Sequence, residues 1–148
     1  MLDFPNSPSI GNLFPSTPAA NTPVWQWDGT AWQPTGPVGV LYGVIPENSQ
    51  SANYTTVLAD AGKFIYHPAT DNNARTFTIA ANASVAYGIG TVISFVNMIN
   101  TLTIAITTDT MTLAGTGATG SRTLAANGVC TAMKIGTTAW IISGTGLT

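Results

Sequence analysis

The chain has 148 residues, a length sufficient for one domain or for one domain with an additional arm. Only 7% of its residues are charged, against about a quarter in ordinary globular domains, and the formal net charge is −2. With four Lys and Arg residues in all, the chain lacks the basic surface that binds phosphate backbones, so we expect no nucleic-acid partner.

The start of the chain and its longest apolar stretch bear on localisation. Residues 1–9 have neither the basic start nor the apolar run of a secretory signal, so we expect synthesis in a cytoplasm. The longest apolar stretch, Val85–Ile99, is interrupted by Gly88 and Gly90. It is also shorter than the ~20 residues that a membrane-spanning helix needs. We therefore expect no membrane partner.

Residues 1–37 differ in composition from the rest of the chain, because they contain seven of the nine prolines. Proline fixes φ and removes a backbone donor, which excludes a long helix or a central strand here. Apolar side chains recur between the prolines, at Phe4, Leu13, Phe14 and Trp25. We expect an extended arm that lies on another protein surface and is anchored there by these side chains. The composition also fits a disordered tail, which stays the alternative.

The sequence VWQWDGTAWQP, residues 24–34, predicts a β-hairpin inside this arm. Asp28-Gly29 suits a two-residue type I′ turn, since both central positions of that turn need positive φ. This register places Trp25 opposite Trp32 and gathers both with Trp27 on one face. A two-stranded hairpin is marginally stable alone, so we expect the three tryptophans to pack on a partner. A platform that stacks against a carbohydrate is the alternative.

From Val38 onward the sequence is typical of short β-strands separated by turns. Apolar and polar residues alternate in short runs, with Asn, Asp, Ser and Gly between them, and no stretch keeps a helical period. We therefore expect residues 38–148 to form an all-β domain, an antiparallel β-sandwich or barrel. The predicted strands are Val38–Ile45, Tyr54–Leu58, Lys63–His67, Arg75–Ala81, Thr91–Met98, Leu102–Thr107, Thr110–Leu113, Val129–Ile135 and Ala139–Ser143.

The stretch Asn100–Leu113 carries the clearest strand pattern. Its apolar residues alternate with threonine and alanine on both sides of a turn candidate at Thr108-Asp109. Such strands bury one apolar face and expose threonine on the other, and β-branched threonine favours the extended backbone. This pattern predicts a β scaffold and no catalytic chemistry.

The strand predicted at Thr91–Met98 has apolar residues on both faces. Ile93 and Phe95 point to one side, and the other side carries Val92, Val96 and Met98. A strand buried on both faces is central in a sheet or lies between subunits. The predicted domain also has only two lysines to guard its strand edges against pairing. We therefore predict that copies of the chain meet one another at Val92, Val96 and Met98.

Three patterns resemble ligand sites only in part. Gly115–Gly120 matches G-x-G-x-x-G, but no acidic residue follows it, so we expect a glycine-rich loop. Asp71-Asn72-Asn73 lacks the glycine and the distal glutamate of a calcium loop, and it predicts a turn. His67 is the only histidine, so it either ends a strand or meets its copies at a threefold axis. We expect no metal and no cofactor.

Groups for catalysis are equally sparse. Asp60, Asp71 and Asp109 are available as the carboxylate pair of a glycosidase, but each stands in a turn-like context. No nucleophile elbow accompanies His67. Cys130 has no basic or histidine neighbour in sequence and is expected to be a small buried hydrophobe. We therefore predict no catalytic residues and no enzyme activity, and a glycan-degrading enzyme stays an alternative.

Several runs of the sequence resemble parts of tailed-bacteriophage structural proteins. Three of them are similar to the C-terminal β domain of phage tail-fibre and virion-surface proteins: Tyr54–Lys63, Phe77–Val85 followed by Gly90-Thr91, and Met133–Trp140. Two others are similar to the N-terminal segment of such proteins: Asp3–Pro8 and Trp25–Trp32. Together these runs extend over most of the chain.

This resemblance implies a non-enzymatic, commonly homotrimeric protein of the virion surface, made in the cytoplasm of the host bacterium. A receptor-binding fibre would carry a long shaft between the two modules, whereas only Val38–Asn53 separates them here. We therefore expect a capsid-surface decoration or head-fibre protein, attached to a capsid or tail protein through residues 1–37. The alternative is a tail-fibre or baseplate module that recognises a host surface polysaccharide.

Overall fold

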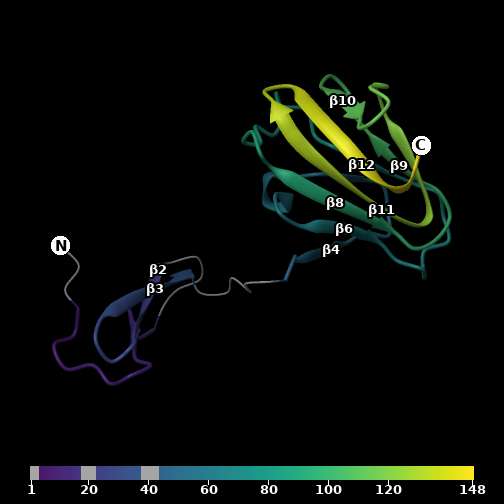
Figure 1. Cartoon of the computed structure of the whole chain (residues 1–148). Helices are drawn as coiled ribbons and strands as arrows, with labels where there is room; N and C mark the ends of the chain where they lie inside the picture. Colours follow the sequence, from purple (N-terminus) through teal and green to yellow (C-terminus); the bar gives the residue numbers. More distant parts are fainter. Residues whose placement is uncertain (1–3, 18–22, 38–43) are drawn as a thin grey trace. The chain divides into compact units, whose positions relative to one another are not determined.

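The computed structural model describes residues 4–17, 23–37 and 44–148. The chain divides into two compact units, unit 1 (Met1–Val44) and unit 2 (Ile45–Thr148). Figure 1 shows the strands of both units: β1 (Leu13–Phe14), β2 (Pro23–Trp27), β3 (Trp32–Pro37), β4 (Glu47–Ser49), β5 (Tyr54–Thr55), β6 (Phe64–His67), β7 (Arg75–Thr78), β8 (Val92–Asn97), β9 (Leu102–Ala105), β10 (Thr110–Leu113), β11 (Arg122–Gly136) and β12 (Ala139–Leu147).

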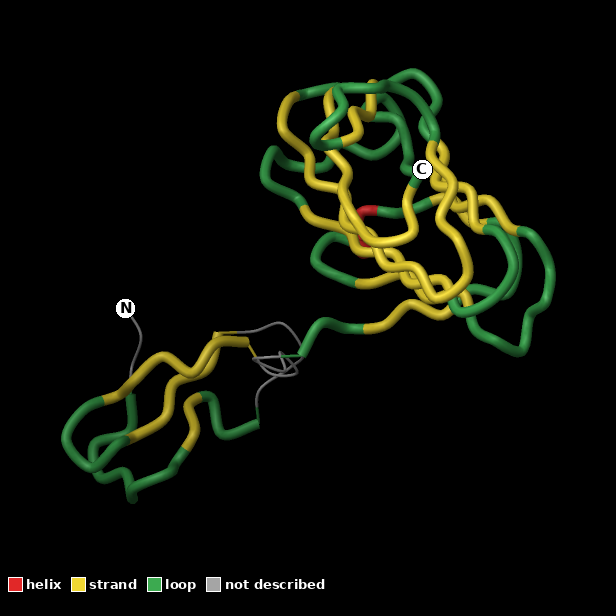
Figure 2. Tube along the Cα trace, turned by 45° about the vertical axis from the view of Figure 1, so that its right-hand side comes forward, coloured by secondary structure: helices red, strands yellow, loops and turns green. Residues whose placement is uncertain are grey.

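Strands and loops make up almost all of the described chain (Figure 2). Its one helical element is the short 3₁₀ turn η1 (Leu58–Asp60). The predicted all-β class is therefore confirmed. The strands β6, β8 and β10 lie close to their predicted bounds, whereas β11 and β12 are longer than predicted. Most of the strand predicted at Val38–Ile45 lies outside the described residues.

Unit 1 contains a three-stranded antiparallel sheet in the order β1-β2-β3. In β1, Phe14 pairs with Trp25 of the central strand β2, and Trp25 pairs on its other side with Pro34 of β3. Pro34 cannot donate a backbone hydrogen bond, which an edge strand such as β3 tolerates. The described part of the proline-rich segment is therefore folded locally, with its prolines at a strand start, in the edge strand β3 and in loops.

The predicted hairpin is present as β2 and β3, but its predicted register is wrong. Trp27 lies opposite Trp32, so the connecting loop has four residues instead of two. The carboxylate of Asp28 explains the longer loop, because its Oδ1 accepts the backbone N–H groups of Thr30 and Ala31, each at 2.8 Å. These side-chain hydrogen bonds replace those of the predicted tight turn.

Unit 2 is built from strands that alternate between two stacks. β4, β6 and β8 lie side by side in parallel, and so do β5, β7 and β9. Successive strands therefore belong to opposite stacks. Parallel neighbours need a crossover connection, and here the intervening strand of the other stack is part of it. The predicted antiparallel pairing holds for β11 with β8, β9 and β12, whereas the sequence pattern does not predict these parallel pairs.

The long strand β11 joins the two stacks. Its residues Arg122–Leu124 pair with β9, and Gly128–Met133 pair with β8. β12 runs antiparallel to β11 and pairs in parallel with β10 (Figure 1). A register shift with β12 separates the two halves of β11, and Asn127 within it has a φ of 60°. Such a bulge changes the direction of a strand, and this allows β11 to pair with β9 at one end and with β8 at the other.

The core of unit 2 is one contiguous cluster of buried residues from both stacks and from β10 to β12. Ile65 and Phe95 come from one stack, Phe77 and Ile104 from the other, and none of the four has exposed surface. Burying a large apolar side chain contributes about 1.5–3 kcal/mol. Consecutive strands such as β9 and β10 do not pair with each other. They are held together by this shared core and not by backbone hydrogen bonds between them.

We predict that Gly144→Ala destabilises unit 2. Gly144 lies opposite Cys130, and a Cβ at this position would overlap the carbonyl oxygen of Val129 and the Cα of Cys130. Overpacking of this kind costs about 1–3 kcal/mol. Urea unfolding measures the loss, with Ser143→Ala at the exposed neighbouring position as the control. An unchanged unfolding midpoint for Gly144→Ala would contradict the close approach of β11 and β12.

Candidate functional site

One sheet face of unit 2 carries apolar side chains that point away from the core. Because side chains alternate along a strand, the neighbours of the buried residues of β8 and β11 point outward. Strand pairing places Val92 beside Met133 and Val96 beside Val129. We call this surface the outer face; it consists of Phe64, Tyr66, Val92, Ser94, Val96, Val129, Thr131, Met133, Ile135 and Ile141.

The outer face is partly exposed and almost without charge. Val129 is 48% exposed, Met133 42% and Ile135 49%. Ser94 and Thr131 lie opposite each other, and their hydroxyl oxygens share a hydrogen bond of 3.0 Å. Among the described residues, the one charged side chain that continues these rows is Glu47 on the edge strand β4. A surface of this kind can be buried without leaving a charge unpaired.

The predicted subunit-interface residues lie on this face or beside it. Val92 and Met98 are each 37% exposed, and Val96 is half-buried. The described residues of unit 2 therefore leave the outer side of β8 partly uncovered. Val129 and Met133 are not among the predicted interface residues. Their alternation with buried residues of β11 is the signal that identifies them.

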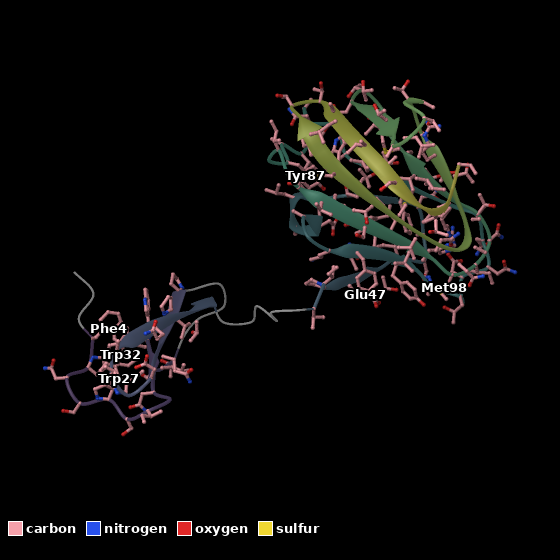
Figure 3. All side chains as sticks on the ribbon, viewed as in Figure 1. Phe4, Trp27, Trp32, Glu47, Tyr87 and Met98 are labelled. Atoms are coloured by element: carbon pink, nitrogen blue, oxygen red, sulfur yellow. The ribbon has the colours of Figure 1, made fainter. Side chains whose placement is uncertain are left out.

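The aromatic side chains predicted as anchors contact one another in unit 1, and Figure 3 labels Phe4, Trp27 and Trp32 among them. The ring centroid of Phe4 lies 4.9 Å from Phe14, 5.6 Å from Trp25 and 5.3 Å from Trp32. Trp27 joins through Trp32, at 5.7 Å. Each such pair contributes about 0.5–1.5 kcal/mol beyond the area it buries. These five residues, the aromatic cluster, are half-buried, so part of each ring remains accessible to a partner.

Two aliphatic side chains of unit 1 are more accessible than the aromatic cluster. Leu13, the sixth predicted anchor, is 40% exposed, and Ile10 is 78% exposed. Ile10 is not among the predicted anchors, because a single isoleucine next to a serine and a glycine carries no periodic signal. Both residues add apolar surface that the described part of unit 1 leaves uncovered.

Asp60 is buried, and its carboxylate oxygens are hydrogen-bonded inside unit 2. Oδ1 accepts the side-chain amide of Asn48 at 2.8 Å. Oδ2 accepts the hydroxyl of Tyr54 at 2.7 Å and the backbone N–H of Val57 at 2.8 Å. Burial, and then the hydrogen bond to Asp60, raise the pKa of Tyr54. This carboxylate fixes η1 against β4 and β5, which is a structural role.

His67 and Asp71 form a second internal cluster. Nδ1 of His67 lies 2.7 Å from Oδ1 of Asn97, and Nε2 lies 3.2 Å from Oδ2 of Asp71. Arg75 donates two hydrogen bonds to the same carboxylate, at 2.7 and 3.0 Å. His67 has no exposed surface. It therefore ends β6 inside the core and does not face other copies of the chain.

Asp109 and Cys130 are the two remaining candidates for catalytic side chains. Asp109 is 6% exposed, and its two oxygens accept the backbone N–H of Asn82 at 3.2 and 3.1 Å. Burial raises the pKa of the Cys130 thiol to about 12, which keeps it from forming the reactive thiolate near neutral pH. The three aspartates occupy turns or turn-like segments as predicted, but they are buried and bonded rather than exposed.

Comparison with protein-family models, with curated proteins and with solved structures found no match to this chain. Among residues 4–17, 23–37 and 44–148, no group of three or more His, Cys, Asp or Glu side chains is placed to hold a metal ion. In the same ranges no helix has the length and apolar character needed to cross a membrane. The outer face and the aromatic cluster are therefore the candidate functional surfaces.

We predict that Asp71 makes the stability of unit 2 depend on acid pH. Hydrogen bonds from Arg75 and then from Asn73 hold the pKa of Asp71 well below its usual range. A depressed folded-state pKa stabilises the fold above the unfolded-state pKa of about 4, and this stabilisation is lost as the pH falls toward the folded-state value. Asp71→Asn should lower stability at pH 7 and flatten its decline below pH ~4 in urea unfolding.

The matched control for this experiment is Asp28→Asn. Asp28 also has a lowered pKa, through hydrogen bonds from Ala31, Thr30 and Gln33, but it belongs to unit 1. The control should leave the acid dependence of the unit 2 transition unchanged. An equally steep acid dependence in wild type and Asp71→Asn would contradict the prediction.

Proposed function

We propose that this protein is a non-enzymatic structural protein of a bacteriophage virion, a decoration or head-fibre protein of the capsid surface. Its sequence runs resemble those of phage virion-surface proteins, which supports this assignment. The observation that carries the proposal is the outer face, which is largely apolar, has no charged side chain and is partly exposed in unit 2. Exposed apolar surface of this kind is typical of protein–protein contacts.

The occupant that fits the outer face best is another copy of the same chain. An uncharged surface is complementary to an equally uncharged one, and its central hydroxyl pair, Ser94 and Thr131, is already satisfied within the face. The family resemblance favours three copies. We therefore propose a homotrimer in which the outer faces, including Val92 and Val96, meet around the axis.

Unpaired strand edges support the proposed assembly less strongly than we expect from the sequence. Lys134, one of the two lysines of the predicted domain, is 1% exposed and lies inside unit 2, so it guards no edge. The edge strands β4 and β5 have only three and two residues, and short edges are themselves protected against pairing. The case for assembly therefore depends on the outer face and not on unpaired edges.

The internal use of the carboxylates favours a structural role over catalysis. Asp60, Asp71 and Asp109 are each bonded to main-chain or side-chain groups of their own unit. A glycosidase needs two carboxylates that face each other across a substrate-sized gap. These three groups instead hold turns and strand ends in place.

Unit 1 is the proposed attachment module. Its aromatic cluster presents half-buried rings, and Leu13 and Ile10 add exposed apolar surface. These groups would bind a groove between capsid subunits. Because three copies present three such modules, the attachment of the trimer would be multivalent, and weak single contacts would add up to stable binding.

Val92→Asp should dissociate the trimer without unfolding the chain. The side chain is 37% exposed in one copy, so a charge there is tolerated by the monomer but costly inside an interface. Multi-angle light scattering should give three times the 15.3 kDa chain mass for wild type and about one chain mass for the variant. Thr116→Asp, in the exposed glycine-rich loop, is the control and should stay trimeric. A wild-type mass of 15.3 kDa at micromolar concentration would contradict the assembly.

Deleting residues 1–44 should leave unit 2 folded and trimeric but unable to join particles. Unit 2 has its own contiguous core, and the deleted residues make up unit 1. Circular dichroism measures the fold, and electron microscopy of particles mixed with full-length or truncated protein measures attachment. Normal decoration by the truncated protein would contradict the anchoring role. Full-length protein found at the tail in few copies would favour the polysaccharide-binding alternative.

A further inference from the structure

Lys134 is a lysine enclosed in the interior of unit 2. It stands on β11 directly opposite Trp140 of β12, and it is 1% exposed. Its Nζ lies 5.4 Å from the centre of the Trp140 ring. Within the described part of the chain, no carboxylate lies within ion-pair distance of this amine. Interior lysines are normally paired with an acid, because an unpaired buried ammonium is costly.

The group that Lys134 contacts is a carboxamide. Nζ donates a hydrogen bond of 2.8 Å to Oδ1 of Asn82. Because a C=O bond is about 1.2 Å long, the carbonyl carbon of this amide lies within about 4 Å of the amine nitrogen. Atoms that are positioned to react are roughly 3–3.5 Å apart, so the distance from Nζ to this carbon is close to that range.

Both partners are held by backbone hydrogen bonds. The backbone N–H of Asn82 donates to the two carboxylate oxygens of Asp109, at 3.2 and 3.1 Å. Lys134 donates its backbone N–H to Thr91 and accepts that of Gly90, each at 2.8 Å. Lys134 and Trp140 are buried, the indole Nε1 of Trp140 finds no hydrogen-bond partner among the described residues, and Asn82 is half-buried. Two groups held in contact in this way react with a high effective concentration.

We propose that Lys134 and Asn82 are a self-modification site, at which the chain forms an intramolecular isopeptide bond. Nζ of Lys134, as the neutral amine, attacks Cγ of Asn82, and a new C–N bond forms. The bond from Cγ to Nδ2 of Asn82 breaks, and Nδ2 takes one N–H proton from the attacking amine and leaves as ammonia. The proton that the lysine ammonium released before the attack ends on this ammonia, so one lysine ammonium and one carboxamide yield a secondary amide and an ammonium ion. No oxidant, metal or cofactor is required.

The bond would tie the middle of unit 2 together covalently. Asn82 follows β7, whereas Lys134 lies on β11, the strand that both stacks share. The link would remove a buried amine charge and close a long loop of the chain, and both effects stabilise a fold. It lies within one chain, so it does not depend on how copies assemble or where they attach.

Mass spectrometry of the purified full-length protein tests the bond directly. The denatured chain should weigh about 17 Da less than its sequence predicts, which is the mass of ammonia. Trypsin should cut after Arg75 and Arg122 but not after Lys134, because an acylated lysine is not a cleavage site. The digest should therefore contain residues 76–122 joined to residues 123–148 as one cross-linked species. Fragmentation should place the link at Asn82 and Lys134.

Two variants and the tryptic digest distinguish the isopeptide bond from other reactions that release ammonia. Lys134→Met keeps the length of the side chain without its amine, and Asn82→Ala removes the carboxamide, so both should restore the full mass. A succinimide at Asn127-Gly128 would also remove ammonia, but it would leave peptides 76–122 and 123–134 separate. Recovery of those two separate peptides from folded wild-type protein, after incubation for days at neutral pH, would overturn the proposal, whatever the variants do.

Discussion

The architecture of unit 2 depends on β11 pairing with both stacks. β4, β6 and β8 form one parallel set, and β5, β7 and β9 form another. Without β11, these two sets share a core but no backbone hydrogen bonds between neighbouring strands. The bulge around Asn127 and the absence of a side chain at Gly144 let β11 and β12 run together across this junction. The rest of the domain is arranged around that shared strand.

The scarcity of charge has a structural counterpart. Asp60, Asp71, Asp109 and Lys134 all lie in the interior of unit 2, where hydrogen bonds fix their positions. The described surface of unit 2 is consequently made mostly of hydroxyl, amide and apolar groups, with Glu47 as an exposed charge. Recognition through such a surface relies on shape and apolar area, and it is less sensitive to salt than recognition through exposed charges. Burial of these four groups is one reason why the outer face carries no charged side chain of its own.

Alternation in the sequence predicts most strands of unit 2, because a half-buried strand places apolar residues at every second position. It also separates Val92 and Val96 from the buried residues of β8. Alternation carries no information on strand direction or on distant partners, which is why the parallel pairs are not predicted. The predicted register of the β2–β3 hairpin is wrong because the side chain of Asp28 accepts two backbone N–H groups and so stabilises a longer loop. Lys134 occupies an inward position of β11, but its charge alone suggests exposure.

The order of the strands along the chain affects how the protein is made. A ribosome synthesises β4 to β9 before β11, so both parallel sets emerge before the strand that joins them. Until β11 follows, the free edges of β8 and β9 are open to pairing with other chains. Contacts between residues far apart in the sequence also slow folding, since long loops must close first. The nascent domain therefore passes through a stage in which a chaperone, or another copy, can compete for those edges.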